Sequence, residues 1–250
     1  MRRVLEKLSH ALEILLFPGG WRAKLKTPAF NRDAWHLCIT LARMGVKPAT
    51  VLDVGANVGQ FALAAGHILQ PRKLFSFEPI PDVFGQLQKL PLGNETDFEP
   101  VCMALSDVVG QADFRITSQS ASSSLLPLGK VHQELYPEIT EDRVISVRLE
   151  TLDTYLKTQD CPEPRLLKLD VQGSELDVLK GCQRLAETFS WILLETSTIP
   201  FYRNGSTFSE IEAYLTANGF RWLGPVAIHE PCADRVAPTM QFDALYGRDD

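Results

Sequence analysis

Acidic side chains stand at the ends of three successive apolar runs in this chain. Asp53 lies in VLDVG, Glu78 closes FSFEP, and the pair Ser106–Asp107 follows VCMAL. If these runs are parallel strands, their carboxyl ends meet at the edge of the sheet where ligands of such sheets bind. There Asp53 could bind an amine, Glu78 could accept hydrogen bonds from two ribose hydroxyls, and the Ser–Asp pair could reach an adenine edge. We therefore expect a ligand that carries a nucleoside at this edge.

The turn after the first run narrows the choice of ligand. It reads Gly55-Ala-Asn-Val-Gly59, so Asn57 stands where a dinucleotide-binding G-x-G-x-x-G turn has its second glycine. Gly55 and Gly59 let the backbone approach a ligand, and Asn57 tolerates a left-handed backbone while adding an amide. A diphosphate would favour bare backbone N–H groups at this corner. The turn therefore predicts S-adenosylmethionine as the cofactor and disfavours a nicotinamide dinucleotide.

A second polar group follows a later apolar run, in KLDVQGSE. If the methyl group of such a cofactor passes to a hydroxyl, the reaction needs an aligned nucleophile and a group that accepts its proton. Our hypothesis assigns Asp170 as the general base or as an acceptor-positioning group, with Glu175 orienting it or the acceptor. Alternatively, Asp170 caps the following helix and Glu175 only favours the helix N-terminus. These two residues and Glu195 could also converge on Mg²⁺, but their spacing is not a metal motif, so no metal site is assigned.

From about residue 50, short apolar runs alternate with amphipathic stretches, which predicts repeated βαβ units on a parallel sheet. The expected strands of this sheet cover residues 50–55, 73–79, 98–106, 165–171, 190–197, 221–229 and 240–248. Helices are expected over 59–69, 82–90, 174–185 and 207–218, the last one ended by Gly219. Because two strands end the chain with no helix between them, we expect the last strand to run antiparallel. Residues 112–117 and 143–150 alternate in polarity and are predicted as strands with one solvent-facing side.

The serine-rich segment 118–142 is the least regular part of the chain. It is too long for a tight turn, and such loops are either binding loops or lids, or surface excursions. Acceptor contacts are expected from this segment and from residues 198–207. They contain His132, expected as a solvated loop histidine rather than a base, and Tyr202.

Composition and charge describe a globular protein without a basic surplus. The 250 residues carry a net charge of −6, which disfavours nucleic acid as the main partner. The five cysteines are scattered and form no C-x-x-C pair, which predicts a reducing compartment and a cytoplasmic location. No apolar run reaches the roughly 18 residues that a membrane span needs.

The N-terminal segment is predicted to begin with an amphipathic helix. Its leucines recur at helical spacing: Leu5, Leu8, Leu12, Leu15 and Leu16. The helix could dock on its own domain or on a sister subunit, which would make the protein a homo-oligomer, or it could lie on a membrane surface. We expect a helical extension over residues 1–49 and one catalytic domain over residues 50–250.

Several of these motifs resemble one known family. LDVGANVGQFALAA, FSFEPIPDVFGQL, ALSD, VRLETLDTYL, LLKLDVQGSELDVLKG and MQFDALYGR are similar, in this order, to segments of the FkbM family of S-adenosylmethionine-dependent methyltransferases. The resemblance runs from about residue 50 to residue 248, and KLDVQGSE is its most specific motif. It implies an α/β fold of the Rossmann-like class I methyltransferase type, with seven strands, an antiparallel seventh strand and flanking helices. It also implies O-methylation, often of sugars or natural products.

The sequence thus predicts a methyltransferase that uses S-adenosylmethionine to methylate a hydroxyl of a sugar or other small-molecule acceptor. Two alternatives stay open. One is a non-catalytic scaffold or binding protein on the same fold, and the other is an NAD(P)-dependent oxidoreductase. Asn57 counts against the oxidoreductase, and the carboxylates Asp53, Glu78 and Asp170 count against the scaffold.

Overall fold

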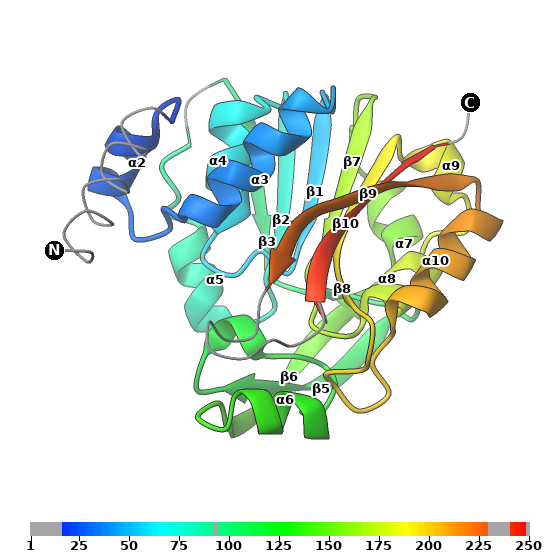
Figure 1. The fold of residues 1–250 in the computed structure, drawn as a ribbon. Coiled ribbons are helices and arrows are strands. Elements are labelled where there is room, and N and C mark those ends of the chain that lie inside the picture. The colour runs from blue at the N-terminus through cyan, green and yellow to red at the C-terminus, as the bar shows by residue number, and fades with distance from the viewer. Residues whose placement is uncertain (1–16, 93–94, 230–240, 249–250) are drawn as a thin grey trace, which may run out of the picture.

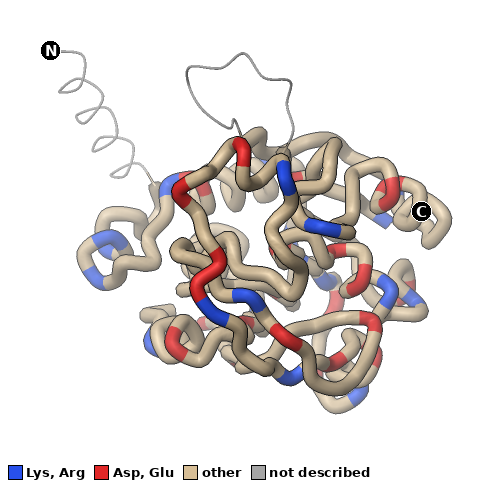
Figure 2. The backbone as a smooth tube through the Cα atoms, turned by 90° about the horizontal axis from the view of Figure 1, so that it is seen from below, with Lys and Arg blue, Asp and Glu red and all other residues tan. Residues whose placement is uncertain are grey.

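The computed structural model describes residues 17–92, 95–229 and 241–248 (Figure 1). The predicted helix marked by Leu5 to Leu16 and the cysteine Cys232 lie outside these residues. Among the described residues, no helix is long and apolar enough to cross a bilayer. Acidic and basic positions are interspersed over the face seen in Figure 2.

The main sheet has seven strands in the order β3-β2-β1-β7-β8-β10-β9. They are β1 (Thr50–Val54), β2 (Lys73–Phe77), β3 (Asp97–Val101), β7 (Arg165–Leu169), β8 (Trp191–Ser197), β9 (Phe220–His229) and β10 (Gln241–Arg248). β1, β2, β3, β7 and β8 pair in parallel, and β10 pairs antiparallel with both β8 and β9. The predicted fold class and the antiparallel last strand are therefore confirmed.

Helices cover both faces of this sheet (Figure 1). One face packs against α3 (Arg32–Arg43) and α4 (Gln60–Ile68) in a core that contains Trp35, Leu63 and Val51. The other face packs against α7 (Leu152–Leu156), α8 (Glu175–Lys180) and α10 (Phe208–Ala217). The strands are apolar on both faces because each face is buried by a helical layer. The shorter helices are α2 (Gly20–Lys26), α5 (Pro81–Leu87), α6 (Lys130–Leu135) and α9 (Leu185–Thr188).

The single strand predicted over residues 98–106 is divided between the main sheet and a small second sheet. The chain leaves the main sheet after Val101, and β4 (Ala104–Leu105) pairs with β6 (Glu141–Glu150) instead. β6 also pairs with β5 (Gly110–Thr117), so the two strands expected to have one solvent-facing side form a hairpin-like pair. This sheet lies next to the carboxyl ends of the main strands (Figure 1).

Two further differences concern helices. The helix predicted over 174–185 ends at Lys180, because Gly181 is its C-cap and packs against the carbonyl of Ser106, and α9 is a separate turn. α7 was not predicted. The helix predicted over 207–218 is confirmed as α10, with a capping box between Thr207 and Glu210 and Gly219 at a φ of 80°.

Candidate active site

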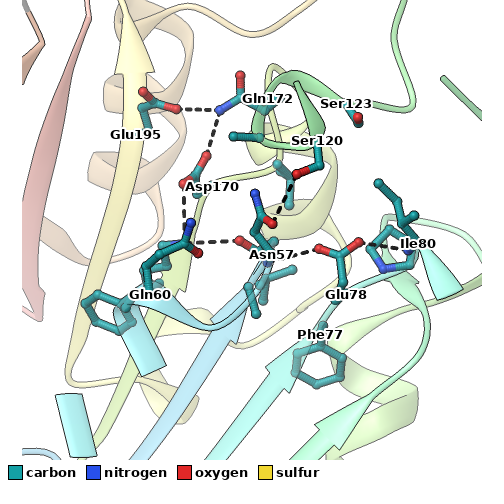
Figure 3. Close-up of a pocket in the computed structure, with 18 of the residues that line it drawn as sticks. Asn57, Gln60, Phe77, Glu78, Ile80, Ser120, Ser123, Asp170, Gln172 and Glu195 are labelled. Atoms are coloured by element: carbon teal, nitrogen blue, oxygen red, sulfur yellow. Dashed lines mark hydrogen bonds and ion pairs between the residues drawn. The ribbon is translucent and has the colours of Figure 1, made fainter. Parts of the chain in front are cut away.

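A cavity of about 310 Å³ opens at the carboxyl ends of β1, β2 and β7. Its volume is at the lower end of the range for small-molecule sites. It is bounded by the start of α3, by residues 54–57 and 77–80, and by the serine segment after β5. Figure 3 shows Asp170, Gln172 and Glu195 on one side of it and Asn57 and Glu78 on the other.

The turn at residues 55–59 is held in a left-handed conformation. Gly55 has a φ of 77° and Asn57 a φ of 50°, as the sequence predicted for this corner. The N–H groups of Gly55 and Ala56 both donate to the carbonyl of Phe77, at 3.1 and 2.9 Å. A side chain at Gly55 would overlap the backbone carbonyl of Asp170. Glycine is therefore required directly after β1, where the backbone of Asp170 leaves no room for a side chain.

Glu78 is fixed by two backbone groups at the end of β2. Its Oε2 accepts the N–H of Asn57 at 3.0 Å, and its Oε1 accepts the N–H of Ile80 at 2.8 Å. The side chain is buried, and burial raises its pKa to about 7 although both hydrogen bonds oppose that change. Each carboxylate oxygen has a second lone pair, so Glu78 can still accept hydrogen bonds from a ligand in the cavity.

Asp53 and Lys168 form a buried ion pair beneath the cavity. The Nζ of Lys168 lies 3.1 Å from Oδ1 of Asp53 and 3.3 Å from the carbonyl of Gly55. Burial opposes the charge of Lys168, but the carboxylates of Asp53 and Asp170 together outweigh it and raise the pKa of the lysine. Lys168 lines the cavity and Asp53 does not. The sequence analysis missed Lys168, although a lone lysine inside the apolar run RLLKLDV is a visible signal.

Three other predicted cofactor residues lie outside the cavity lining. They are Gly59, Ser106 and Asp107. Gly59 caps α4, with the side chains of Leu87 and Leu90 against it. The pairing of β4 with β6 brings Met103–Leu105 to the cavity in place of the Ser–Asp pair.

Three side chains from neighbouring strand ends form a hydrogen-bonded group. The Nε2 of Gln172 donates to Oδ1 of Asp170 and to Oε2 of Glu195, each at 2.7 Å. Burial by itself would raise the pKa of Asp170, but Lys168 and the amide of Gln172 outweigh it and hold that pKa below its usual range. Burial and the facing carboxylate of Asp170 raise the pKa of Glu195 well above its usual range. Asp170 is thus ionised at neutral pH, and Glu195 keeps its proton to a higher pH than an ordinary glutamate does.

Glu175 supports the turn that carries this group. Its carboxylate accepts the N–H groups of Val171 and Gly173, both at 3.0 Å, and it does not line the main cavity. Burial raises its pKa to about 7. No set of three or more His, Cys, Asp or Glu side chains within residues 17–92, 95–229 and 241–248 is arranged to hold a metal ion.

The serine segment after β5 reaches the cavity. Ser120 Oγ donates to Oδ1 of Asn57 at 3.3 Å, and Ser124 Oγ donates to the carbonyl of Gln172 at 2.8 Å. The hydroxyl of Tyr202 lies 2.7 Å from Oε1 of Gln172. The segment therefore contacts both sides of the cavity.

The expectation that His132 is a solvated loop histidine was wrong. α6 turns its ring against those of Tyr136, Phe201 and Tyr202, and only 4% of the residue is exposed. Burial lowers its pKa.

A histidine that the sequence analysis did not select lines the cavity instead. His229 ends β9, and its Nε2 lies 3.2 Å from Oδ2 of Asp243 on β10 and 3.9 Å from Oε1 of Glu195.

Comparison with known proteins agrees with this geometry. A family model described as the methyltransferase FkbM domain matches residues 53–222. The hexuronic acid methyltransferase AglP of Haloferax volcanii is 24% identical over 143 residues, which cover 57% of this chain and 54% of that protein. The methyltransferase sdnD of Sordaria araneosa is 26% identical over 207 residues, or 73% of this chain and 77% of sdnD. The 2-O-methyltransferase NoeI of Sinorhizobium fredii is 28% identical over 160 residues, or 61% of this chain and 65% of NoeI. The chain thus spans about half the length of AglP and slightly less than two thirds of NoeI.

Proposed function

The chain belongs to the family of methyltransferases with an FkbM domain, and on that premise we propose that it transfers a methyl group from S-adenosylmethionine to a hydroxyl of a sugar or other small-molecule acceptor. The names of AglP and NoeI describe methyl transfer to a hexuronic acid and to a 2-hydroxyl. These relatives support a carbohydrate acceptor for this chain.

The environment of Glu78 is the observation that carries the cofactor proposal. Its carboxylate is held by the N–H groups of Asn57 and Ile80 and keeps free lone pairs at the cavity. Ribose hydroxyls are donors that such a carboxylate accepts well. Phe77, Ile80 and Met103 provide apolar contact for an adenine ring beside it. The roles of Asp53, Gly59, Ser106 and Asp107 in cofactor binding stay predictions.

Bound S-adenosylmethionine would supply an electrophilic methyl group, and the chain has to align the acceptor and exclude water. Asp170 is suited to receive or orient the acceptor hydroxyl because Lys168 and Gln172 keep it ionised inside the cavity. Glu175 acts indirectly, because its carboxylate accepts the N–H groups of the turn at 171–173 that follows Asp170. We propose no metal ion in the reaction.

Calorimetry with S-adenosylhomocysteine tests the cofactor proposal directly. We expect saturable binding at micromolar concentration and no competition by NADH. Binding too weak to saturate at millimolar concentration would favour the non-catalytic alternative.

Transfer of labelled methyl groups to a panel of methyl glycosides tests the reaction. Asp170→Asn should lower kcat by about 10²-fold with little change in S-adenosylhomocysteine affinity, because it removes the charge that faces the acceptor. Near-normal turnover by Asp170→Asn would contradict a role for this carboxylate as base or as positioning group.

A further inference from the structure

A histidine–aspartate pair stands at the cavity wall opposite Glu78, on strands that supply none of the predicted site residues. His229 ends β9 and Asp243 lies near the start of β10. In the antiparallel register Asp243 faces Ala227 on one side and Glu195 on the other, so His229 is its diagonal neighbour on the same face of the sheet. Ala227, His229, Asp243 and Glu195 all line the cavity.

We propose that His229, oriented by Asp243, is the general base that takes the proton of the acceptor hydroxyl. This inference rests on the proposed function and assigns its proton-transfer step. Asp170 is then the positioning group for the acceptor.

The carboxylate of Asp243 fixes the orientation of the His229 imidazole ring. A carboxylate only accepts hydrogen bonds, so Nε2 of His229 carries its hydrogen toward Oδ2 of Asp243, 3.2 Å away, and Nδ1 keeps a free lone pair. The side chain of His229 is 40% exposed, whereas those of Asp243 and Glu195 are 15% and 18% exposed. The ring can therefore meet an acceptor and later lose its proton to solvent.

Asp170 is less suited to this step. Its Oδ1 is engaged by Gln172 at 2.7 Å, and its Oδ2 lies 3.5 Å from Nζ of Lys168. These contacts stabilise its charged form and lower its proton affinity. A general base works best when its pKa is near the working pH. The hydrogen bond that His229 donates to Asp243 raises the pKa of His229 above its ordinary value of 6.5, whereas the contacts of Asp170 lower the pKa of that carboxyl group.

The step balances as follows. The acceptor oxygen forms a bond to the methyl carbon, and the carbon–sulfur bond breaks with its electron pair going to sulfur. The hydroxyl proton passes to Nδ1 of His229, and Asp243 stabilises the imidazolium. The products are a methyl ether, S-adenosylhomocysteine and one proton that His229 releases to water.

Four carboxyl groups surround His229, and they set the pH dependence. Asp243 comes from β10, Glu195 from β8, Asp170 follows β7, and Asp33 comes from α3. The charges of Asp243, Asp170 and Asp33 favour the imidazolium form of His229. The rate should therefore fall as pH drops through the pKa of His229.

The first experiment is an NMR titration of ¹³C-labelled histidine in the full chain with S-adenosylhomocysteine. We expect the resonance of His229, assigned with His229→Asn, to titrate above pH 6.5 and to shift to lower pH in Asp243→Asn. An unchanged midpoint in Asp243→Asn would overturn the assignment of Asp243. This readout does not depend on finding the acceptor.

The second experiment measures methyl transfer from labelled S-adenosylmethionine to methyl glycosides of neutral hexoses and of hexuronic acids. His229→Asn should lower kcat by at least about 100-fold and abolish the acidic limb, with S-adenosylhomocysteine affinity within twofold of the wild type. His36→Asn on α3, outside the cavity lining, is the matched control and should keep wild-type kcat. Wild-type turnover in His229→Asn would overturn the inference. Failure of the wild type to bind S-adenosylhomocysteine would instead overturn the proposed function.

Discussion

The two halves of the cavity are built in different ways. The half that we propose binds the cofactor, residues 54–57 and 77–80, is called the cofactor half and is held by main-chain hydrogen bonds, including those of Gly55 and Ala56 to Phe77. The half that we propose binds the acceptor is called the acceptor half and is held by hydrogen bonds between side chains. It consists of Asp170, Gln172, Glu195, His229 and Asp243. Backbone N–H and C=O groups do not titrate, so Glu78 is the titratable group among residues 54–57 and 77–80, whereas four of the five residues of the acceptor half can titrate. The main-chain contacts of the first half therefore do not depend on pH, whereas most contacts of the second half do.

The largest effect is expected where the halves touch. Gly55→Ala would drive a methyl group into the carbonyl of Asp170 at a left-handed φ. We expect the free energy of unfolding to fall by about 4 kcal/mol or more in urea titrations. Gly45→Ala is the control, because Gly45 has a φ of 84° with no atom within 4 Å, and it should cost only about 1–2 kcal/mol. Equal losses would mean that the close approach of Gly55 to the backbone of Asp170 is unimportant.

A smaller effect, on the affinity for S-adenosylhomocysteine, is expected from a substitution in the cofactor half. Glu78→Gln removes a charge and turns an amide toward a backbone N–H donor. Calorimetry should show S-adenosylhomocysteine binding weakened by about 1.5–3 kcal/mol. Asp82→Asn changes an exposed carboxylate that pairs with Arg143, and it should leave the affinity unchanged. Loss of affinity in both variants would point to net charge rather than to the contact of Glu78.

Buried acids provide a prediction about pH. The pKa of Glu175 rises from 4.5 to about 7 on folding because of burial, so the folded state keeps this proton longer than the unfolded chain does. The free energy of unfolding should therefore fall as pH rises from about 5 to 7, by up to about 1.4 kcal/mol per pH unit from this group. Glu175→Gln should flatten that slope in denaturation curves, and Glu78 leaves a remainder of the same sign. A steeper slope in the variant would contradict the assignment.

The smallest effect tests the connection from the serine segment to the acceptor half. Tyr202→Phe removes the hydroxyl 2.7 Å from Oε1 of Gln172 and 3.0 Å from the carbonyl of Ser122. We expect a loss of about 1 kcal/mol in the free energy of unfolding and an unchanged affinity for S-adenosylhomocysteine. Tyr214→Phe on α10, outside the cavity lining, is a comparison for removing a tyrosine hydroxyl elsewhere. A change in cofactor affinity in Tyr202→Phe alone would show that the two halves are coupled.

Sequence reasoning located the cofactor half because its signals are local. Asn57 was expected in a left-handed corner and has that conformation, and Glu78 closes its strand beside the cavity as expected. Ser106 lies outside the cavity lining because the chain leaves the main sheet after Val101 and the two-residue strand β4 pairs with β6 instead. No periodicity in such a short run shows which sheet it joins.

The acceptor half was only partly predictable because it depends on strand register. Asp170 was predicted as a candidate catalytic residue because it directly follows an apolar run. His229 and Asp243 meet through a diagonal contact between β9 and β10, whose pairing contains two irregularities. The pattern of polar and apolar residues does not show this register. It also does not show that β10 lies between β8 and β9, which both precede it in the chain.

The antiparallel strand also has an evolutionary consequence. Because β10 enters the sheet beside β8, a new side chain near its start would line the cavity at the proposed acceptor half, while the hydrogen bonds of the turn at 55–59 stay in place. Such a scaffold could be retargeted to other hydroxyl compounds by a few substitutions in one hairpin, with methyl-donor recognition inherited intact.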